Sequence, residues 1–242
     1  CVDGNVVLGD NCRLDAHVVV TGTTSIGADT RIFPFASIGH ISQDLKYDGE
    51  LVSLEIGARN TIREHVTMNP GTRNGGAVTR IGDDNLFMVG VHVAHDCVVG
   101  SNVIMANNAT LGGHVSVADF AILGGLVGVH QFSRIGAHSF VGAGSLVTED
   151  VIPFGMVSGN RAILGGLNLV GLKRRDFDRK EINALRAAYK DVFTTQNATF
   201  QARLLRARET YAESDLVNQM IDFILVEKSR GYCLPSPSPS GA

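Results

Sequence analysis

An apolar residue recurs at every sixth position over long stretches of this chain. Neither an α-helix, with its period of 3.6, nor an isolated strand, with its period of 2, requires a strict repeat of six. Such a repeat is typical of a parallel β-helix, in which the chain coils so that equivalent residues stack. The longer run is Ile81, Phe87, Val93, Val99, Met105, Leu111, Val117, Leu123, Val129, Ile135, Val141 and Val147, and an earlier run is Val2, Leu8, Leu14, Val20, Ile26, Ile32 and Ile38.

Three hexads would make one coil, so residues 18 apart are expected to lie one above the other, with coils about 4.8 Å apart. Two polar segments interrupt the repeat, at 39–55 and at 69–80. The repeat resumes at Ile56, three hexads after Ile38, so the first segment either fills one coil or loops out from it. The second segment shifts the phase of the six-residue repeat by one residue. Long loops within a regular scaffold are usually functional or disordered.

The hexads end near Pro153, which predicts a β-helix domain over residues 1–153. A helical C-terminal domain is predicted over 154–234, beginning with irregular chain over 154–171. The low-complexity tail, 235–242, is predicted to be disordered.

Three helices are expected in the C-terminal domain. Asp178 and Glu181 form a candidate N-terminal capping pair for the first. Its apolar face is Ile182, Leu185, Tyr189 and Val192. The second helix is predicted near 200–211 and the third over 215–229, with Gly231 as its stop.

Composition fits a thin core with many tight corners. The chain has 242 residues, is 44% apolar, and contains 28 Gly and no Trp. No apolar run is long enough for a membrane span, so none is expected, and no signal peptide is visible. The four cysteines lack metal-ligand spacing. Cys12 and Cys97, at the fifth position of their hexads, are interpreted as small buried residues in a reducing compartment. Because the chain begins at Cys1 within a hexad and without Met, we expect a segment to precede it.

Charge is unevenly distributed along the chain, whose net charge is −3. Residues 1–170 carry 9 basic and 15 acidic residues, whereas 171–210 carries 10 basic and 5 acidic residues, a net charge of +5. This basic segment either attracts an anionic partner or forms a solvated helical surface.

Five of the eight histidines lie between residues 92 and 138. By hexad position, His95, His114 and His130 fall on one face of three successive coils, where they are predicted to line a cleft, with His92 near the corner. Solvated histidines and a Zn²⁺ site are the alternatives. No two histidines are five apart, as they are in the γ-class carbonic anhydrases. Asp96 and Gln131, which follow His95 and His130 in the sequence, instead favour acid–base chemistry. We predict no metal and no cofactor.

Five segments together resemble the UDP-N-acetylglucosamine O-acyltransferases of lipid A biosynthesis, and the resemblance covers nearly the whole chain. They are QDLKY (43–47), HVAHDC (92–97), ANNATLGGHVSV (106–117), GVHQF (128–132) and GLNLVGLKRRDF (166–177). The resemblance implies a left-handed parallel β-helix with C-terminal helices. It also implies a cytoplasmic homotrimer of a Gram-negative bacterium, with active sites between subunits.

The implied reaction moves an (R)-3-hydroxyacyl chain from acyl carrier protein to the 3-hydroxyl of UDP-N-acetylglucosamine, the first step of lipid A biosynthesis. Acyl carrier protein is acidic and would bind the basic C-terminal helices. No nucleic acid partner is expected.

The resemblance also implies roles for individual residues. His95 would be the general base, Asp96 would set its tautomer, and the Gly113 backbone N–H would stabilise the oxyanion. Asp44 and Lys46 would contact the sugar from the first interruption. The remaining substrate contacts would be His92, His114, His130 and Gln131 in the sugar and pantetheine cleft, and Asn168, Arg174 and Arg175 beside the nucleotide.

Two residues depart from the family pattern. Val170 stands where Glu is common, which removes one polar contact from the nucleotide side. Ala143 stands where Gly is common near the end of the acyl groove, so we expect a slightly shorter acyl chain.

Three other functions stay open at this point. The related N-acyltransferases act on a 2-amino group and usually carry an extra N-terminal uridine-binding domain. A transferase acting on a 3-amino sugar nucleotide would share nearly all of these motifs. A non-catalytic scaffold would need neither the histidine stripe nor the two loops.

Overall fold

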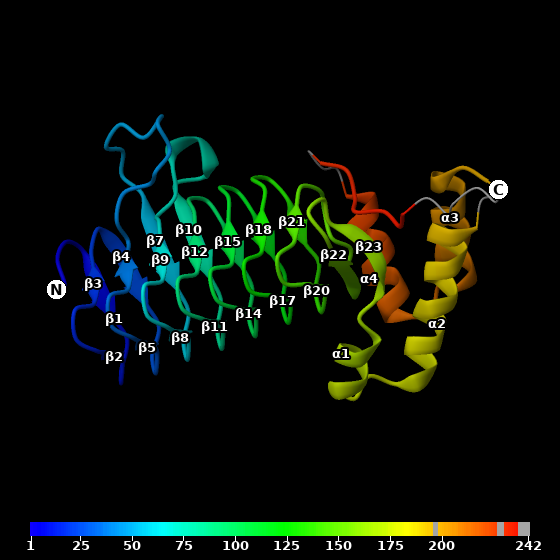
Figure 1. Ribbon diagram of the computed structural model, residues 1–242, viewed down its shortest axis with the longest axis horizontal. Coiled ribbons are helices and arrows are strands. Elements are labelled where there is room, and N and C mark those ends of the chain that lie inside the picture. Colours follow the sequence, from blue (N-terminus) through cyan, green and yellow to red (C-terminus); the bar gives the residue numbers. More distant parts are fainter. Residues whose placement is uncertain (196–197, 227–229, 237–242) are drawn as a thin grey trace.

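The computed structural model describes residues 1–195, 198–226 and 230–236. Its body is a parallel β-helix whose coils follow one another along the long axis, with the helices gathered at the C-terminal end (Figure 1). The predicted disorder of the tail falls largely on residues 237–242, which lie outside the described residues.

Short strands stack into three sheets that form the walls of the β-helix. Sheet 1 contains β1 (Val6–Leu8), β4 (Thr23–Ile26), β7 (Ser53–Ile56), β10 (Val78–Ile81), β13 (Val98–Val99), β16 (Ser116–Val117) and β19 (Arg134–Ile135). Sheet 2 contains β2 (Arg13–Leu14), β5 (Arg31–Ile32), β8 (Thr61–Ile62), β11 (Leu86–Phe87), β14 (Ile104–Met105), β17 (Ile122–Leu123), β20 (Phe140–Val141), β22 (Gly155–Ser158) and β23 (Ile163–Leu167). Sheet 3 contains β3 (Val19–Val20), β6 (Ser37–Ile38), β9 (Thr67–Met68), β12 (His92–Val93), β15 (Thr110–Leu111), β18 (Gly128–Val129) and β21 (Leu146–Val147).

From Val20 onward the hexad residues fill the interior, as the period of six predicts, whereas Val2 and Leu8 in the first coil are 51% and 40% exposed. Phe87 pairs with Met105 and Met105 with Leu123, at the expected spacing of three hexads. All three side chains are fully buried. Complete burial of such a side chain stabilises the fold by about 1.5–3 kcal/mol, so the stacked hexads form the core.

Many corners between sheets pass through a non-glycine residue in the left-handed region. At the corner from sheet 3 to sheet 1, φ is 58° at Asp96, 61° at His114 and 66° at Phe132. These residues recur every 18 positions, so their side chains stack on successive coils. The rings of His114 and Phe132 lie parallel, with centroids 4.4 Å apart. The corners therefore place polar and aromatic groups in vertical columns.

Both interruptions loop out of the β-helix. Ile26 pairs with Ile56, so the coil that contains the first interruption is five hexads long instead of three, and Ile38 stacks on Met68. The alternative in which the first segment fills one coil is therefore wrong. The second interruption includes a short 3₁₀ turn, η1 (Arg73–Gly75). The two loops lie side by side on one edge of the β-helix (Figure 1).

The prediction of irregular chain over 154–171 is wrong. Strand β22 extends sheet 2 in parallel, and β23 returns antiparallel to it. Helix α1 (Leu169–Arg174) follows. Because Phe140 pairs with Met156, the spacing falls below three hexads, and the hexad pattern cannot reveal β22. The predicted domain boundary at 153 stays a prediction.

The expected C-terminal helices are present as α2 (Arg179–Tyr189), α3 (Phe200–Thr210) and α4 (Asp215–Leu225), with a π-helical turn, η2 (Lys190–Thr194), after α2. Asp178 caps α2 by accepting from the backbone N–H groups of Lys180 and Glu181, as predicted. Glu181 does not complete the pair, since its carboxylate accepts from Ser214 at the start of α4. The last predicted turn of the third helix falls on 227–229, outside the described residues.

Within the described ranges, no helix has the length and apolar character needed to cross a membrane. The four cysteines carry free thiols. Cys97 is buried and Cys12 is partly buried, and each donates to a backbone carbonyl of the next coil.

Candidate active site

A cavity of about 720 Å³ opens beside the corner from sheet 3 to sheet 1. Its wall comes from coils at and after β12, from the first loop and from the start of the second loop. The residues that line it are Gln43, Asp44, Leu45, Lys46, Asn69, His92, Ala94, His95, Thr110, Leu111, Gly112, His114, Gln131 and Phe132.

His95 and Asp96 form a hydrogen-bonded pair at the edge of this cavity. His95 Nδ1 lies 2.8 Å from Asp96 Oδ2, and the Asp96 side chain is fully buried while that of His95 is 14% exposed. A carboxylate can only accept, so Nδ1 carries the proton of this bond. When the ring is neutral, its lone pair therefore lies on Nε2, which can accept a proton.

The corner geometry explains why neighbours in sequence can pair. Asp96 occupies the left-handed region, which Asp tolerates better than most residues. Its backbone N–H donates to Thr79 Oγ1 at 2.8 Å. This turn of the backbone allows the Asp96 carboxylate to meet the imidazole of the residue before it.

Two further histidines, His92 and His114, line the same cavity as His95. His114 lies one coil on, its ring edge-on to that of His95 with centroids 5.1 Å apart. His92 is hydrogen-bonded through Nδ1 to Thr67 Oγ1 at 2.7 Å. Burial is the main cause that lowers the pKa of both His92 and His114, and it therefore favours neutral rings. Both rings can donate to or accept from a polar group in the cavity.

His95, Asp96 and His114 bring possible metal-ligand atoms within 4.8 Å of one another. The Asp96 carboxylate, however, already accepts from the Thr72 backbone N–H, the Thr72 hydroxyl and His95. This arrangement suits a hydrogen-bonded acid–base pair better than a metal centre, which needs the carboxylate lone pairs.

Gly113 lies directly against the His95 ring. A Cβ at this position would lie 2.4 Å from His95 Cε1 and 2.5 Å from Nε2, so any side chain would collide with the imidazole. Its carbonyl accepts from Phe132, whereas among the described residues no group accepts its N–H. A backbone donor thus remains available close to the imidazole.

The first loop brings two more predicted residues to the cavity. Asp44 and Lys46 both line it, and Asp44 holds the turn by accepting from the Lys46 backbone N–H at 3.0 Å. Gln131 also lines the cavity. His130 is not brought there: it is exposed, and its Nδ1 faces the carbonyl of Gln131.

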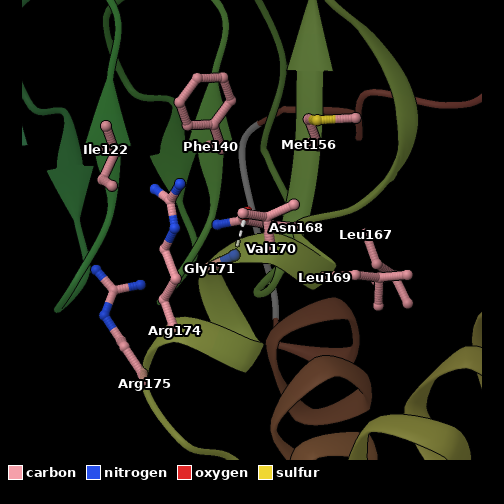
Figure 2. A pocket seen from close by; sticks show the side chains of 10 residues that line it. All are labelled: Ile122, Phe140, Met156, Leu167, Asn168, Leu169, Val170, Gly171, Arg174 and Arg175. Carbon is pink, nitrogen blue, oxygen red and sulfur yellow. Dashed lines mark hydrogen bonds between the residues drawn. The ribbon is translucent and has the colours of Figure 1, made fainter.

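The other predicted substrate residues lie in a second cavity, of about 490 Å³, against sheet 2 (Figure 2). Asn168, Val170, Arg174 and Arg175 line it from the side of α1. Its floor is apolar and comes from Ile122, Phe140 and Met156. Asn168 caps α1 by accepting from the Gly171 backbone N–H at 3.0 Å. The predicted site residues therefore divide into two groups on different faces of one chain.

Arg175 is anchored to the β-helix, whereas Arg174 extends into the cavity (Figure 2). The Arg175 guanidinium donates to the Phe120 carbonyl at 3.2 Å and lies over the Phe120 ring. Burial lowers the pKa of Arg175, but an Arg side chain stays charged in proteins. Val170 is 61% exposed at the rim, where it adds apolar surface instead of an acceptor.

Ala143 lies at neither cavity. It is an exposed residue at the corner from sheet 2 to sheet 3. Its backbone stacks on that of Gly124, where an added Cβ would lie 2.6 Å from the Ala143 nitrogen.

Sequence reasoning missed Thr72 and Asn69, both from the second loop. Thr72 binds Asp96, which is far from it in the sequence, and Asn69 lines the first cavity and donates to the His40 carbonyl in the first loop. The length and polar, glycine-rich composition of the loop predicted a segment that is either functional or disordered. Nothing in the hexad spacing placed it over Asp96.

Comparison with known proteins agrees with these features. Residues 150–233 match the family model for domain 2 of UDP-N-acetylglucosamine O-acyltransferases, and residues 79–113 match the bacterial transferase hexapeptide model. The chain is 47% identical over 237 residues to the acyl-[acyl-carrier-protein]–UDP-N-acetylglucosamine O-acyltransferase of Rhizobium etli, covering 98% of this chain and 87% of the relative. It is 53% identical over 231 residues to that of Caulobacter vibrioides, covering 96% and 88%.

Solved structures give the same result. LpxA from Acinetobacter baumannii superimposes with a TM-score of 0.87 at 39% identity, covering 96% of this chain and 92% of that one. The UDP-N-acetylglucosamine acyltransferase of Francisella novicida gives a TM-score of 0.91 at 36% identity, covering 96% and 84%. These matches confirm the predicted left-handed parallel β-helix with C-terminal helices. The chain belongs to the acyl-[acyl-carrier-protein]–UDP-N-acetylglucosamine O-acyltransferases.

Proposed function

We propose that this acyltransferase moves an (R)-3-hydroxyacyl chain from acyl carrier protein to the 3-hydroxyl of UDP-N-acetylglucosamine, with His95 as general base. The family membership supports acyl transfer to this sugar nucleotide in lipid A biosynthesis. The observation that carries the proposed mechanism is the His95–Asp96 pair, whose Nδ1 is fixed at 2.8 Å from a buried carboxylate. Nε2 then takes the proton of the sugar hydroxyl as that oxygen attacks the thioester.

The developing oxyanion needs a fixed donor near the base. The Gly113 N–H is the proposed donor, because it is unpaired within the described residues and its Cα approaches the His95 ring. When the tetrahedral intermediate collapses, the carrier thiolate leaves and takes the proton held by His95. Base, donor and leaving group thus complete the transfer without a cofactor.

The second cavity is proposed to hold the nucleotide. Arg174 presents a planar fork of donors, which suits the two phosphates of UDP. Asn168 and Arg175 stand beside it. Because this cavity and the His95 cavity lie on different faces, one chain cannot close both around one substrate. We therefore propose a homotrimer in which the nucleotide cavity of one subunit faces the His95 cavity of its neighbour.

The basic helices are proposed to dock acyl carrier protein. Lys173, Arg179 and Arg186 line a groove of about 490 Å³ between α1 and α2. A cluster of cations attracts an acidic protein and accelerates its encounter, an effect that salt screens. The proposed location is the cytoplasm of a Gram-negative bacterium.

The test is incubation of the protein with (R)-3-hydroxyacyl carrier protein and UDP-N-acetylglucosamine, followed by mass spectrometry of the product. We expect an ester at the sugar 3-position that mild alkali hydrolyses. A parallel reaction with the 3-amino analogue of the sugar nucleotide measures acceptor choice. No product with the hydroxyl acceptor and rapid amide formation with the amine would overturn the proposed acceptor.

A further inference from the structure

The second loop touches Asp96 at both carboxylate oxygens. Thr72 donates its backbone N–H to Oδ1 at 2.8 Å and its hydroxyl to Oδ2 at 2.6 Å. Thr72 is 4% exposed and Asp96 is 6% exposed, so both bonds lie out of water. Asp96 Oδ2 is also the oxygen that faces His95 Nδ1. The Thr72 hydroxyl and the imidazole therefore share one acceptor atom.

The same loop leaves Asp96 almost no room to move. A Cβ at Gly75 would lie 2.0 Å from Asp96 Cγ, so the loop backbone lies directly over the carboxylate. The turn that carries Gly75 is closed by the Thr72 carbonyl, which accepts from the N–H groups of Gly75 and Ala77. From the other side, the Asp96 N–H is held by Thr79. The carboxylate is thus fixed by groups that do not themselves reach the cavity.

The second loop is also fastened to the first loop, which carries Asp44 and Lys46. Arg73, next to Thr72, donates its backbone N–H to Glu50 at 3.0 Å and its side chain to Asp48 at 3.1 Å. Hydrogen bonds from the Arg73 and Asp48 backbones lower the pKa of Glu50 to about 2, so it is ionised at neutral pH. Segment 72–73 therefore joins the proposed catalytic pair to the loop proposed to hold the sugar.

We propose that Thr72 is a positioning residue for the acyl transfer. It holds the Asp96 carboxylate in the plane where Oδ2 meets His95 Nδ1, and so keeps the Nε2 lone pair directed into the cavity. This inference rests on the proposed role of His95. Thr72 itself touches neither substrate nor the reacting atoms, and it acts only through Asp96.

Thr72→Val tests the hydroxyl alone. Val has nearly the same shape as Thr and keeps the backbone N–H bond to Asp96 Oδ1, but it cannot donate to Oδ2. We expect kcat to fall by about tenfold or more, since hydrogen-bond partners that orient the ligands of a metal site typically matter by 10- to 100-fold and Thr72 orients Asp96 in the same way. KM for UDP-N-acetylglucosamine should stay within about twofold. Thr72→Ser restores the hydroxyl and should recover most of kcat.

Two further measurements distinguish a positioning role of Thr72 from a purely structural one. Thr24→Val is the matched control, because Thr24 is a buried Thr in strand β4 whose hydroxyl donates to the Thr21 carbonyl, remote from His95. It should lose as much thermal stability as Thr72→Val but keep kcat. In ¹⁵N spectra of histidine-labelled protein, the His95 signals should show the Nδ1–H form in wild type and a larger Nε2–H population in Thr72→Val.

The outcomes separate this inference from the function on which it rests. An inactive wild type, or full activity in His95→Ala, would defeat the proposed function. If His95→Ala is inactive while Thr72→Val keeps wild-type kcat and tautomer, only the role of Thr72 is overturned. A parallel loss of kcat in Thr24→Val would also overturn it, because the effect would then follow from stability.

Discussion

The two cavities of this chain are assembled in different ways. The His95 cavity is built at the corner of successive coils, where residues 18 apart stack and His114 meets His95 edge-on at 5.1 Å. The second cavity depends on α1, which is held against sheet 2 by packing, including the Arg175 bond to Phe120. Repeat geometry therefore places the stacked histidines of the first cavity, whereas tertiary contacts place α1 at the second. Substitutions at the first cavity should change the rate of the chemical step. Substitutions at the second should change nucleotide binding or the attachment of α1 to sheet 2.

The largest effect is expected for His95→Ala. Removal of a general base typically costs about 10²–10⁴-fold in rate, so kcat should fall by that factor. The oligomer should stay intact, because the His95 side chain is at the cavity and not in the hydrophobic core. Steady-state kinetics and analytical ultracentrifugation measure the two properties. His17→Ala, at an exposed corner of an early coil, is the control, and substantial turnover by His95→Ala would refute the assignment.

Gly113→Ala should act on the same cavity by collision. The new methyl would lie 2.4 Å from His95 Cε1, so either the ring or the corner must shift. A misplacement of about 1 Å can cost about 10²-fold, and we expect kcat to fall to that extent. Gly125→Ala is the matched control at a corner where the nearest atom would be the Asn107 carbonyl oxygen at 3.4 Å. Equal activity of the two variants would argue against close approach at Gly113.

These two predictions rest on features that the sequence could largely supply. The hexads gave the coil, its length of 18 and the meeting of His95 with His114, because a stacked solenoid converts spacing into position. The same spacing did not show that His130 is exposed, since its side-chain direction is set by its own corner. It also gave no means to place Thr72 over Asp96, because that contact depends on how an irregular loop folds back. Asn168 and Arg174 were identified from motif resemblance, and their separation from His95 follows from packing that has no sequence period.

Where α1 and its flanking residues meet the β-helix, His138 should make the stability of the fold depend on pH. Its ring stacks between Phe120 and Phe154, and burial followed by the charge of Arg175 lowers its pKa from 6.5 to about 4, against a smaller opposite effect of Asp119. Its Nδ1 has no hydrogen-bond partner among the described residues. Between these two pH values the unfolded chain binds a proton that the folded chain does not. Stability from this group is therefore complete above pH 6.5 and is lost as the pH falls toward 4.

The shift corresponds to about 3 kcal/mol at most, and solvent screening of this partly exposed ring reduces that figure. We expect His138→Phe, which keeps the stack, to lose about 1–2 kcal/mol less than wild type between pH 7 and pH 4.5. Urea unfolding at the two pH values measures the difference. His17→Phe, which stacks on Phe35 at an exposed corner, is the control. Identical pH dependence in wild type and His138→Phe would show that other groups cause the acid instability.

Arg174→Ala should weaken nucleotide binding and leave the chemistry largely intact. Loss of one charge-assisted contact of about 1.4 kcal/mol raises KM for UDP-N-acetylglucosamine by about tenfold. Arg174→Lys keeps the charge without the fork and should recover only part of the affinity. Arg13→Ala, at an exposed arginine near the N-terminal end, is the control. A fall in kcat with unchanged KM would move Arg174 from the binding group to the catalytic group.

The smallest effect is expected at Ala143, which lines neither cavity but lies at the corner between sheets 2 and 3, above Gly124. If the acyl chain runs along this corner, the Ala143 methyl shortens the available groove, and Ala143→Gly should shift the preferred chain length upward. Each methylene that gains burial contributes about 0.8 kcal/mol, so the rate ratio between neighbouring chain lengths should change about fourfold. A ladder of 3-hydroxyacyl carrier proteins measures this ratio, with Ala118→Gly as the control for added backbone freedom. An unchanged optimum would mean that the chain ends elsewhere, because a groove wall that loses a methyl must admit a longer occupant.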